Sequence, residues 1–319
     1  ILEELAIHKN LGVKTMQTED EIAGICSAIG ASFAGNLAVT TTSGPGLSLK
    51  SEALGLAVMT ELPLVVVDVQ RAGPCTGMPT KTEQTDLNEA LYGRNGESPV
   101  VVMAAHSPAH CFEAAFNASK LALEHMTPVL LLSEGFLGNG SEPWKIPSMS
   151  DFPAIKPRLA KADGTKFQPF LRDEKTLARD WAPAGTPGLE HRVGGLEKTH
   201  TGVLSTDPDN HALMVAERAE KVARVAEDIL TATEELRSHG IDVSRVHFDY
   251  INPLPKNTHE VLSGFKKIIV CELNSGQFEA YLRNRFPEFE YVGCDKVQGQ
   301  VFLVRDIIGA VAPELLKEQ

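Results

Sequence analysis

The sequence predicts an α/β protein in which helices cover both faces of a parallel sheet. Short continuous apolar runs of strand length, rich in β-branched residues, alternate with longer stretches at helical spacing. Strands that are apolar on both faces belong to sheets buried on both sides. With 319 residues, 43% of them hydrophobic and 23% charged, the chain is long enough for two globular domains.

The first part of the chain, to about residue 134, has the clearest alternation. Expected strands lie at residues 13–17, 37–42, 62–70, 100–105 and 127–133. Expected helices lie between them at 19–35, 47–61 and 107–126. This order predicts a single parallel sheet.

The alternation is lost between residues 135 and 208. This stretch holds both tryptophans and seven prolines: Pro143, Pro147, Pro153, Pro157, Pro169, Pro183 and Pro187. An irregular connection of this length is unusual inside one domain. Because Phe152, Phe167, Phe170 and Trp181 are too apolar for a free tether, we expect an ordered linker packed on its own domains or on a neighbour.

The last third returns to α/β alternation. Expected helices lie at 210–240, at 256–264, at 277–286 and from about residue 305, and expected strands lie at 243–251 and 266–273. A domain of this kind should open on a strand, whereas this one opens on a long helical run. We therefore expect a segment to be missing there.

Charge and cysteine content argue against several classes of function. The net charge of −12 disfavours nucleic acid as a partner, because binding to phosphates depends on Lys and Arg. No apolar run approaches the length of a membrane span. The five cysteines lack CxxC spacing and indicate reduced cytoplasmic thiols. No local Asp, Glu, His or Cys spacing is typical of a metal site, so we expect this chain to hold no metal itself.

The stretch "TTTSGPGLSLKSEALG" predicts a strand, a glycine turn and a helix start. Gly44 and Gly46 would let the backbone approach a ligand at the helix N-terminus. A dinucleotide fingerprint with Asp68 as the ribose acid is the tempting interpretation, but Leu49 stands where the third glycine belongs. A tight turn without a ligand explains the pattern equally simply.

Acids and histidines give weaker signals. In "QTEDEIAG", Thr18 and Glu21 have the spacing of a capping box, and acids are favoured in a first helical turn, so structure alone could explain Glu19. His106 lies between an expected strand and an expected helix. His247 lies in an expected strand, where it alternates with the apolar residues Val246 and Phe248. Neither belongs to a recognisable catalytic motif.

The loop that follows the strand 62–70 is a stronger candidate. Arg71 falls at the carboxyl end of that strand, where parallel sheets bind ligands, and Thr76, Thr80 and Lys81 follow. Such a loop suits a carboxylate, because Arg offers a bidentate fork and Lys a point charge. A surface loop whose basic residues pair with Glu83 and Asp86 fits the same spacing.

At this point several ordered motifs resemble one family. The motifs include "QTEDEIAGICSAIGASFAG", "TTTSGPGLSLKSEALGLA", "PLVVVDVQRAGPCTGMPTKTEQTDL", "LGNGSEPWKIP", "GTPGLEHRVGGLEK", "ELNSGQ" and "KVQGQVF". Together they resemble the α subunit of 2-oxoacid:ferredoxin oxidoreductases, most closely the 2-oxoglutarate type, over nearly the whole chain.

The resemblance implies a fold and a domain division. Residues 1–140 would form a thiamine-diphosphate-binding, pyrimidine-type parallel-sheet domain. Residues 141–209 would be the Pro/Gly-rich linker, and residues 210–319 a transketolase C-terminal-like α/β domain.

The implied activity is oxidative decarboxylation of 2-oxoglutarate with coenzyme A to succinyl-CoA and CO₂, with electrons passing to ferredoxin (class EC 1.2.7). A branched-chain or pyruvate enzyme of the same family is a close alternative; a noncatalytic scaffold subunit or an NAD-binding protein is a distant one. The enzyme would be active only with a β subunit that carries Mg²⁺, the diphosphate-binding domain and an iron–sulfur cluster. A γ-type domain or subunit, a higher oligomer and a cytoplasmic location are also expected.

The resemblance also assigns site residues. Glu19 matches the glutamate that hydrogen-bonds the aminopyrimidine N1′ of thiamine, which makes it both catalytic and cofactor-binding. Arg71 matches the arginine that binds the 2-oxoacid carboxylate. Thr80 and Lys81 would meet the distal end of the substrate or coenzyme A, and Ser43, Gly44, Pro45 and Gly46 would form the pocket wall around the pyrimidine.

The sequence departs from the family pattern twice. Relatives carry a "YPITPSS" element just before "ILEEL", whose threonine contacts substrate and coenzyme A. They also carry a strand and glycine turn where Ile229 meets Leu230. We expect both segments to exist in the native protein; a chain without them would be inactive.

Overall fold

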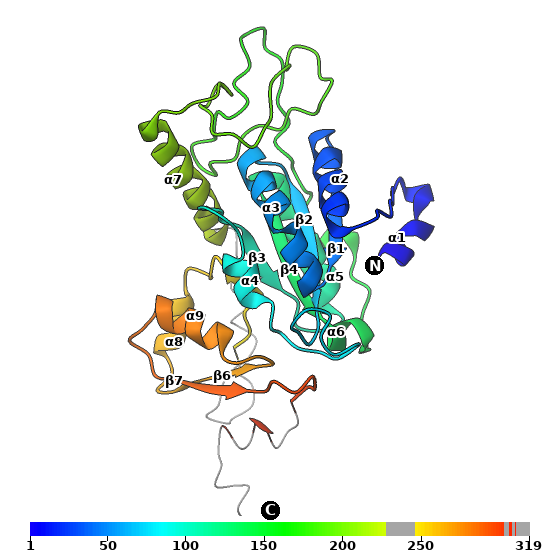
Figure 1. Ribbon diagram of the computed structural model, residues 1–319, viewed down its shortest axis with the longest axis vertical. Coiled ribbons are helices and arrows are strands. Elements are labelled where there is room, and N and C mark those ends of the chain that lie inside the picture. Colours follow the sequence, from blue (N-terminus) through cyan, green and yellow to red (C-terminus); the bar gives the residue numbers. More distant parts are fainter. Residues whose placement is uncertain (228–245, 303–305, 308–309, 311–319) are drawn as a thin grey trace, which may run out of the picture.

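A five-stranded sheet forms the centre of the molecule in this computed structural model, which describes residues 1–227, 246–302, 306–307 and 310 (Figure 1). The strand order is β1-β2-β4-β3-β5. The strands are β1 (Val39–Thr42), β2 (Leu64–Gln70), β3 (Val101–Ala104), β4 (Pro128–Glu134) and β5 (Tyr250–Asn252). The first four are parallel, as the sequence predicts, whereas β5 runs antiparallel to β3.

The central strands are buried on both faces. β2 pairs with β4 along its whole length, from Leu64 opposite Pro128 to Gln70 opposite Glu134. Successive side chains point to opposite faces, so Leu64 and Val66 belong to one core and Val65 to the other. This two-sided burial explains why these strands read as continuous apolar runs.

Helices cover each face of the sheet. On one face lie α2 (Glu21–Phe33), α3 (Gly44–Thr60) and the short α4 (Leu87–Tyr92), which pack into the same apolar cluster. On the other face lie α5 (His110–His125) and α7 (Pro208–Arg224) (Figure 1). The α/β architecture with both faces covered is therefore confirmed.

One local prediction is wrong. Residues 13–17 form no strand, and the sheet ends at β1. Before residue 13 the chain forms only α1 (Leu2–Ile7) and a short 3₁₀ turn, Lys9–Leu11. The predicted strand 243–251 begins in residues outside the described part of the chain, and its described end contains β5, which pairs with β3.

The second part of the linker, from residue 169, contributes buried side chains to the fold, whereas residues 141–168 are exposed or half-buried. Trp181 is buried, packs with Leu123 and Met126, and donates from Nε1 to the carbonyl of Ser32 at 3.2 Å. Within residues 141–207 the regular structure is limited to one 3₁₀ turn, Met149–Asp151, and three isolated β-bridges. Side chains, not backbone ladders, attach this segment to the sheet domain.

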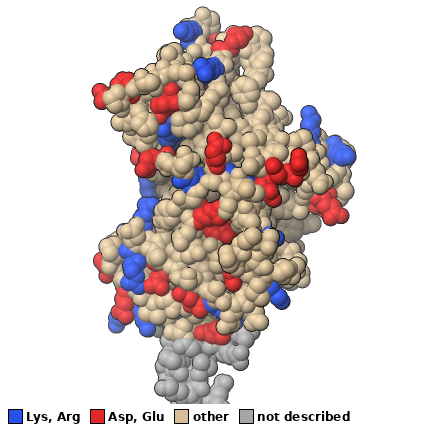
Figure 2. All heavy atoms as spheres, viewed as in Figure 1, with Lys and Arg blue, Asp and Glu red and all other residues tan. Residues whose placement is uncertain are grey.

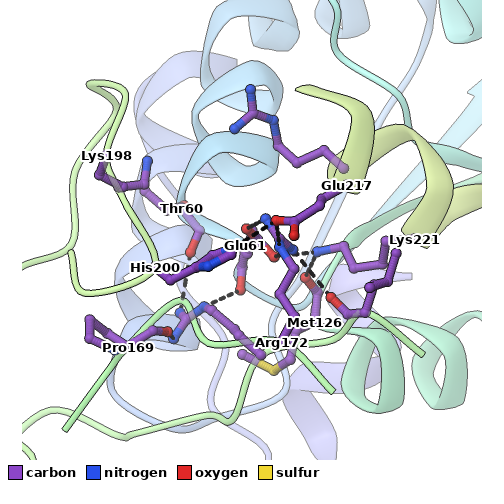
Figure 3. Close-up of polar contacts among 12 residues, drawn as sticks. Thr60, Glu61, Met126, Pro169, Arg172, Lys198, His200, Glu217 and Lys221 are labelled. Carbon is purple, nitrogen blue, oxygen red and sulfur yellow. Dashed lines mark hydrogen bonds and ion pairs between the residues drawn. The ribbon is translucent and has the colours of Figure 1, made fainter. Parts of the chain in front are cut away.

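A buried group of charges holds the linker, α3 and α7 together (Figure 3). Glu61 follows the end of α3 and is 1% exposed. Its carboxylate accepts from Arg172 of the linker and from Lys221 of α7, the latter at 2.7 Å. Burial alone would raise the pKa of Glu61, but Lys221 and Arg172 outweigh it and lower the pKa to about 2.

A smaller unit follows β5. It consists of α8 (Thr258–Ser263), β6 (Ile268–Glu272), α9 (Gln277–Arg285) and β7 (Tyr291–Asp295), with β6 and β7 paired in parallel (Figure 1). It touches the first domain where Gln277 bonds both the Asn88 amide and the Thr85 carbonyl. The predicted elements at 256–264, 266–273 and 277–286 are confirmed.

Some predictions fall on residues outside the described ranges. These are the second half of the helix at 210–240, the junction of Ile229 and Leu230, and most of the final helix from residue 305. Within the described ranges, no helix combines the length and the apolar character that a bilayer crossing requires.

Candidate active site

The loops of interest follow the carboxyl ends of the parallel strands. β1 ends at Thr42 and leads into the Ser43–Gly46 turn, β2 ends at Gln70 and leads to Arg71, and β3 leads to His106. Because these strands are parallel, their carboxyl ends share one edge of the sheet. The fold therefore gathers loops that are far apart in the sequence.

The glycine turn is the centre of this edge. A Cβ atom added to Gly44 would clash with Asp86 Oδ1, and one added to Gly46 would clash with Thr42 Oγ1 and come within 2.8 Å of Glu21 Cγ. The N-terminus of α3 is thus wedged between the end of the Arg71 loop and the start of α2. Close packing requires both glycines here, and Ser43 and Pro45 beside them are half-buried.

Glu19 lines an open pocket with a volume of about 270 Å³. The pocket lies between α1, the start of α2 and β1, and its lining includes Thr18, Asp20, Thr40, Thr41 and Lys50. Glu19 is exposed, and the neighbouring Asp20 caps α2 by accepting from the Ala23 amide at 2.7 Å.

This arrangement corrects the predicted capping box. Asp20, not Thr18, is the N-cap, and Thr18 Oγ1 instead donates to the Asp20 carbonyl. The helix start therefore does not need the Glu19 carboxylate. A buried lysine that sequence reasoning missed, Lys50, donates from Nζ to the Glu21 carbonyl at 2.7 Å and fixes the pocket floor. Burial lowers the pKa of Lys50, although Glu21 and Asp20 oppose the shift.

The pocket has an exposed apolar rim. Leu2, Met16 and Val39, all pocket-lining, are between 41% and 62% exposed. Val39 belongs to β1, which is the outer strand of the sheet. An open strand edge and exposed apolar side chains around a polar pocket are features of a surface that another chain covers.

Arg71 leaves the sheet beside buried polar groups. Its side chain is half-buried, and its Nε is buried with no hydrogen-bond partner in the described part of the chain. The loop beyond it folds back on itself through hydrogen bonds from Ala72 N to Lys81 O and from Met78 N to Ala72 O. Gly77 has a φ of +54°, and a Cβ there would clash with the Ala72 carbonyl, so this tight return requires glycine.

The other two predicted substrate residues lie farther out on this loop. Thr80 and Lys81 are exposed, and Thr80 Oγ1 donates to the Pro79 carbonyl. Lys81 packs beside Gly299 of the C-terminal segment. The structure thus brings Glu19, the Ser43–Gly46 turn and Arg71 to one edge and leaves Thr80 and Lys81 at its solvent side.

Two carboxyl groups lie behind Arg71. Asp68, on β2, is fully buried, and burial, Asp86 and Glu89 raise its pKa to about 8. Burial and Glu89 raise the pKa of Asp86 to about 6, while Arg71 opposes the shift. At neutral pH Asp68 is therefore mostly protonated and Asp86 mostly ionised, so the Arg71 guanidinium faces one carboxylate charge rather than two.

A second polar grouping occurs at the same edge, two strands from β2. His106, His110, His247 and Asp249 lie together there, although 143 residues separate His106 from Asp249. Local spacing could not reveal it. The sequence shows the i, i+4 spacing of His106 and His110. That spacing indicates a site only when the pairing of β5 with β3 brings Asp249 beside both histidines.

Charged side chains are mixed on the face drawn in Figure 2, where acidic and basic residues alternate without a continuous basic stripe. The face drawn there therefore offers no track for a phosphate backbone. These features define an α/β protein with a candidate small-ligand site at the carboxyl ends of its parallel strands, open on the side of β1.

Comparison with known proteins places this class of protein in a family. The family described as pyruvate flavodoxin/ferredoxin oxidoreductase, thiamine diphosphate-binding, matches residues 1–206. The chain belongs to this family.

The similar proteins are subunits of enzymes that act on 2-oxoacids. The chain is 50% identical to the 2-oxoglutarate oxidoreductase subunit KorA of Mycobacterium tuberculosis. The match covers 96% of this chain and 50% of that protein. It is 32% identical to the 2-oxoglutarate synthase subunit KorA of Archaeoglobus fulgidus, covering 89% of this chain and 80% of that one. The chain spans about half the length of the curated relatives that it matches first.

A solved structure agrees. The 2-oxoglutarate:ferredoxin oxidoreductase from Magnetococcus marinus, with 2-oxoglutarate, coenzyme A and succinyl-CoA bound, superposes with a TM-score of 0.83 at 31% identity. The match covers 96% of this chain and 58% of that one. The thiamine-diphosphate-type α/β fold expected from the sequence is confirmed.

Proposed function

We propose that this chain is the α subunit of a 2-oxoglutarate:ferredoxin oxidoreductase, which converts 2-oxoglutarate and coenzyme A to succinyl-CoA and CO₂. The observation that carries the proposal is the convergence of Glu19, the Ser43–Gly46 turn and Arg71 on one sheet edge in a chain of this family. The relatives named as 2-oxoglutarate enzymes support the choice of substrate.

The pocket around Glu19 fits one end of thiamine diphosphate. A volume of about 270 Å³ suits a single small ring, and the Glu19 carboxyl is left free by the helix cap. When bound, thiamine diphosphate supplies a nucleophilic carbon that lets a 2-oxoacid lose CO₂. In this proposal Glu19 holds a proton at the pyrimidine N1′, and Ser43, Gly44, Pro45 and Gly46 form the wall beside the ring.

Arg71 is proposed to bind the carboxylate next to the keto group. A guanidinium with a buried, unpartnered Nε has a donor that an anionic ligand can satisfy. The rigid strand β2 beneath it would hold the 2-oxoacid in one orientation. Thr80 and Lys81, exposed on the same loop, would meet either the distal carboxylate or coenzyme A.

The remaining parts of the active site are proposed to come from a β subunit. That partner would carry the diphosphate-binding half, Mg²⁺ and the iron–sulfur cluster that passes electrons to ferredoxin. The exposed apolar rim of Leu2, Met16 and Val39 supports this division, because it suits burial under a second chain. A γ-type domain or subunit, assembly into a higher oligomer and a cytoplasmic location complete the proposal.

Co-expression with a β subunit of the same family and an anaerobic assay of viologen or ferredoxin reduction test this function. The complex should oxidise 2-oxoglutarate in a reaction that requires coenzyme A and thiamine diphosphate, and the α chain alone should be inactive. Faster turnover of pyruvate or 3-methyl-2-oxobutanoate would reassign the substrate. Failure to assemble with any β chain would favour a noncatalytic scaffold, and activity of the α chain alone would refute the division of labour.

A further inference from the structure

We propose that His106, His110, His247 and Asp249 form a binding site for a divalent transition-metal ion such as Zn²⁺. The four residues come from two segments: His106 and His110 from the turn between β3 and α5, and the other two from the segment that enters β5. The site lies apart from Glu19 and Arg71, and the inference does not depend on the proposed enzymatic activity.

The distances suit a tetrahedral ion. Asp249 Oδ1 lies 2.9 Å from His106 Nδ1, 3.8 Å from His110 Nε2 and 3.7 Å from His247 Nε2. Ligands about 2.0–2.1 Å from a tetrahedral zinc ion are about 3.3 Å apart, so each distance is within about 0.5 Å of the required value. Ligand atoms of His106, His110 and Asp249 all lie within 4.8 Å of one another.

The chemistry of the group favours a metal over a simple ion pair. The rings of His106 and His110 stack with centroids 3.9 Å apart, and the ring of His247 lies 4.7 Å from that of His106. One carboxylate and three imidazoles thus bring four potential ligand groups together, and imidazole is a preferred ligand of zinc, copper and nickel.

The backbone supports the ligands from two sides. The Ala104 amide donates to the Asp249 carbonyl at 2.8 Å, which fixes that residue against β3. Glu142 Oε1 accepts from Ser107 Oγ and from the Ala109 amide, which fixes the turn between His106 and His110. One local contact must be exchanged: the His106 amide lies 3.4 Å from His110 Nδ1, and metal binding at Nε2 places a proton on Nδ1.

The site is reachable and has a structural consequence. The four side chains are between 10% and 42% exposed, so an ion can enter from solvent. Cys111 is adjacent, but its Sγ lies 3.4 Å from the Ser107 carbonyl, and burial raises the pKa of its thiol. A bound ion would join the segment before β5 to the β3–α5 turn and so clamp the antiparallel edge strand onto the sheet.

The test is a zinc titration of the full chain after removal of metals with a chelator. The wild-type protein should bind one Zn²⁺ per chain. His110→Ala and Asp249→Asn should each weaken binding by at least about 100-fold, since the loss of mere outer-shell partners costs about 10- to 100-fold. His259→Ala removes an exposed histidine paired with Glu288 elsewhere and is the matched control, with unchanged affinity expected.

Two further measurements separate this site from other causes. Co²⁺ bound in its place should show tetrahedral visible bands without thiolate charge transfer. Zinc should also raise the melting temperature of the wild type and of His259→Ala, but not that of Asp249→Asn, a nearly isosteric change. Equal zinc affinity in wild type and Asp249→Asn, absence of one-to-one binding, or a thiolate signature would each overturn the proposal.

Discussion

Glu61 and Arg172, 111 residues apart, form a bidentate ion pair in the interior of the protein, with the two guanidinium nitrogens 2.7 and 2.6 Å from the two carboxylate oxygens (Figure 3). Both side chains are at most 3% exposed. Glu61 also accepts from Lys221, so one carboxylate connects α3, the irregular linker and α7. The linker owes its fixed position to this carboxylate as much as to its aromatic residues.

Glu61→Gln should lower the free energy of unfolding by about 3–5 kcal/mol, because it leaves the buried Lys221 without its counter-charge and leaves Arg172 with Glu217 alone. Glu220→Gln breaks an exposed pair with Arg224 and should cost less than about 1 kcal/mol. Chemical denaturation of both variants at pH 7 measures the difference. A cost for Glu61→Gln no larger than that for Glu220→Gln would show that the buried network does not stabilise the fold.

The same pair predicts a pH dependence. The folded-state pKa of Glu61, about 2, lies below its ordinary value of 4.5, so its contribution to stability is fully present above pH 4.5 and is lost as the pH falls toward 2. The stability gap between wild type and Glu61→Gln should therefore close across this window in acid titrations followed by circular dichroism. A constant gap down to pH 2 would contradict the lowered pKa.

Asp68 should make stability depend on pH in the opposite direction to Glu61, and Asp68→Asn should remove that dependence. Because the folded-state pKa of Asp68 is raised to about 8 from 3.8, the folded protein retains a proton that the unfolded chain releases, and stability falls as the pH rises between these values. Asn cannot ionise, so the variant should be more stable than wild type at pH 8 by at least about 1.4 kcal/mol, the equivalent of a single pKa unit.

Melting temperatures at pH 5 and pH 8 test this prediction for Asp68. Asp180→Asn, which alters a surface carboxylate paired with Arg158, is the control and should keep the wild-type slope. If Asp68→Asn also keeps that slope, Asp68 is ionised in the folded protein.

The sequence was sufficient to predict the sheet, because its central strands are buried on both faces. The runs that became β2 and β4 are apolar at almost every position, and their lengths agree with the structure within two residues at each end. The run at 13–17, VKTMQ, is shorter and more polar, and it gains no neighbouring strand. Pairing depends on partners far away in the chain, which local pattern does not contain.

Site residues could be predicted from the sequence where a local pattern marks a helix start or a strand end. Glu19 and Arg71 lie at a helix start and a strand end, positions that a sequence pattern reveals. Lys50, Glu61 and Asp249 were missed for one shared reason: each gains its role from a partner in a distant segment. Of these three residues, Lys50 had a signal in the sequence, because a lysine in the apolar face of a predicted helix indicates a buried charge.

Glu19→Gln should leave the fold intact and remove most of the activity. Asp20 caps α2, so the free energy of unfolding should change by less than about 0.5 kcal/mol. Loss of a positioned acid–base group should slow turnover by about 100-fold or more. Proton exchange at C2 of bound thiamine, followed by NMR in the assembled complex, measures the step directly.

The control for Glu19 is Glu52→Gln, an exposed glutamate of α3, which should exchange at the wild-type rate. Wild-type exchange in Glu19→Gln would instead assign Glu19 to the helix dipole.

Arg71→Lys should raise KM for the 2-oxoacid with little change in stability. Lysine keeps the charge but loses the bidentate fork, and a hydrogen bond to a charged group is worth about 1.5–3 kcal/mol, which corresponds to about a 10- to 100-fold rise in KM. Since 2-oxoglutarate and pyruvate share the carboxylate next to the keto group, KM should rise for both by the same factor. Lys81→Met, by contrast, should raise KM for 2-oxoglutarate or for coenzyme A alone.

Arg192→Lys, at an exposed linker position, is the control for the substitution itself. A rise confined to 2-oxoglutarate would move Arg71 to the distal carboxylate, and a rise confined to coenzyme A would remove it from the 2-oxoacid site.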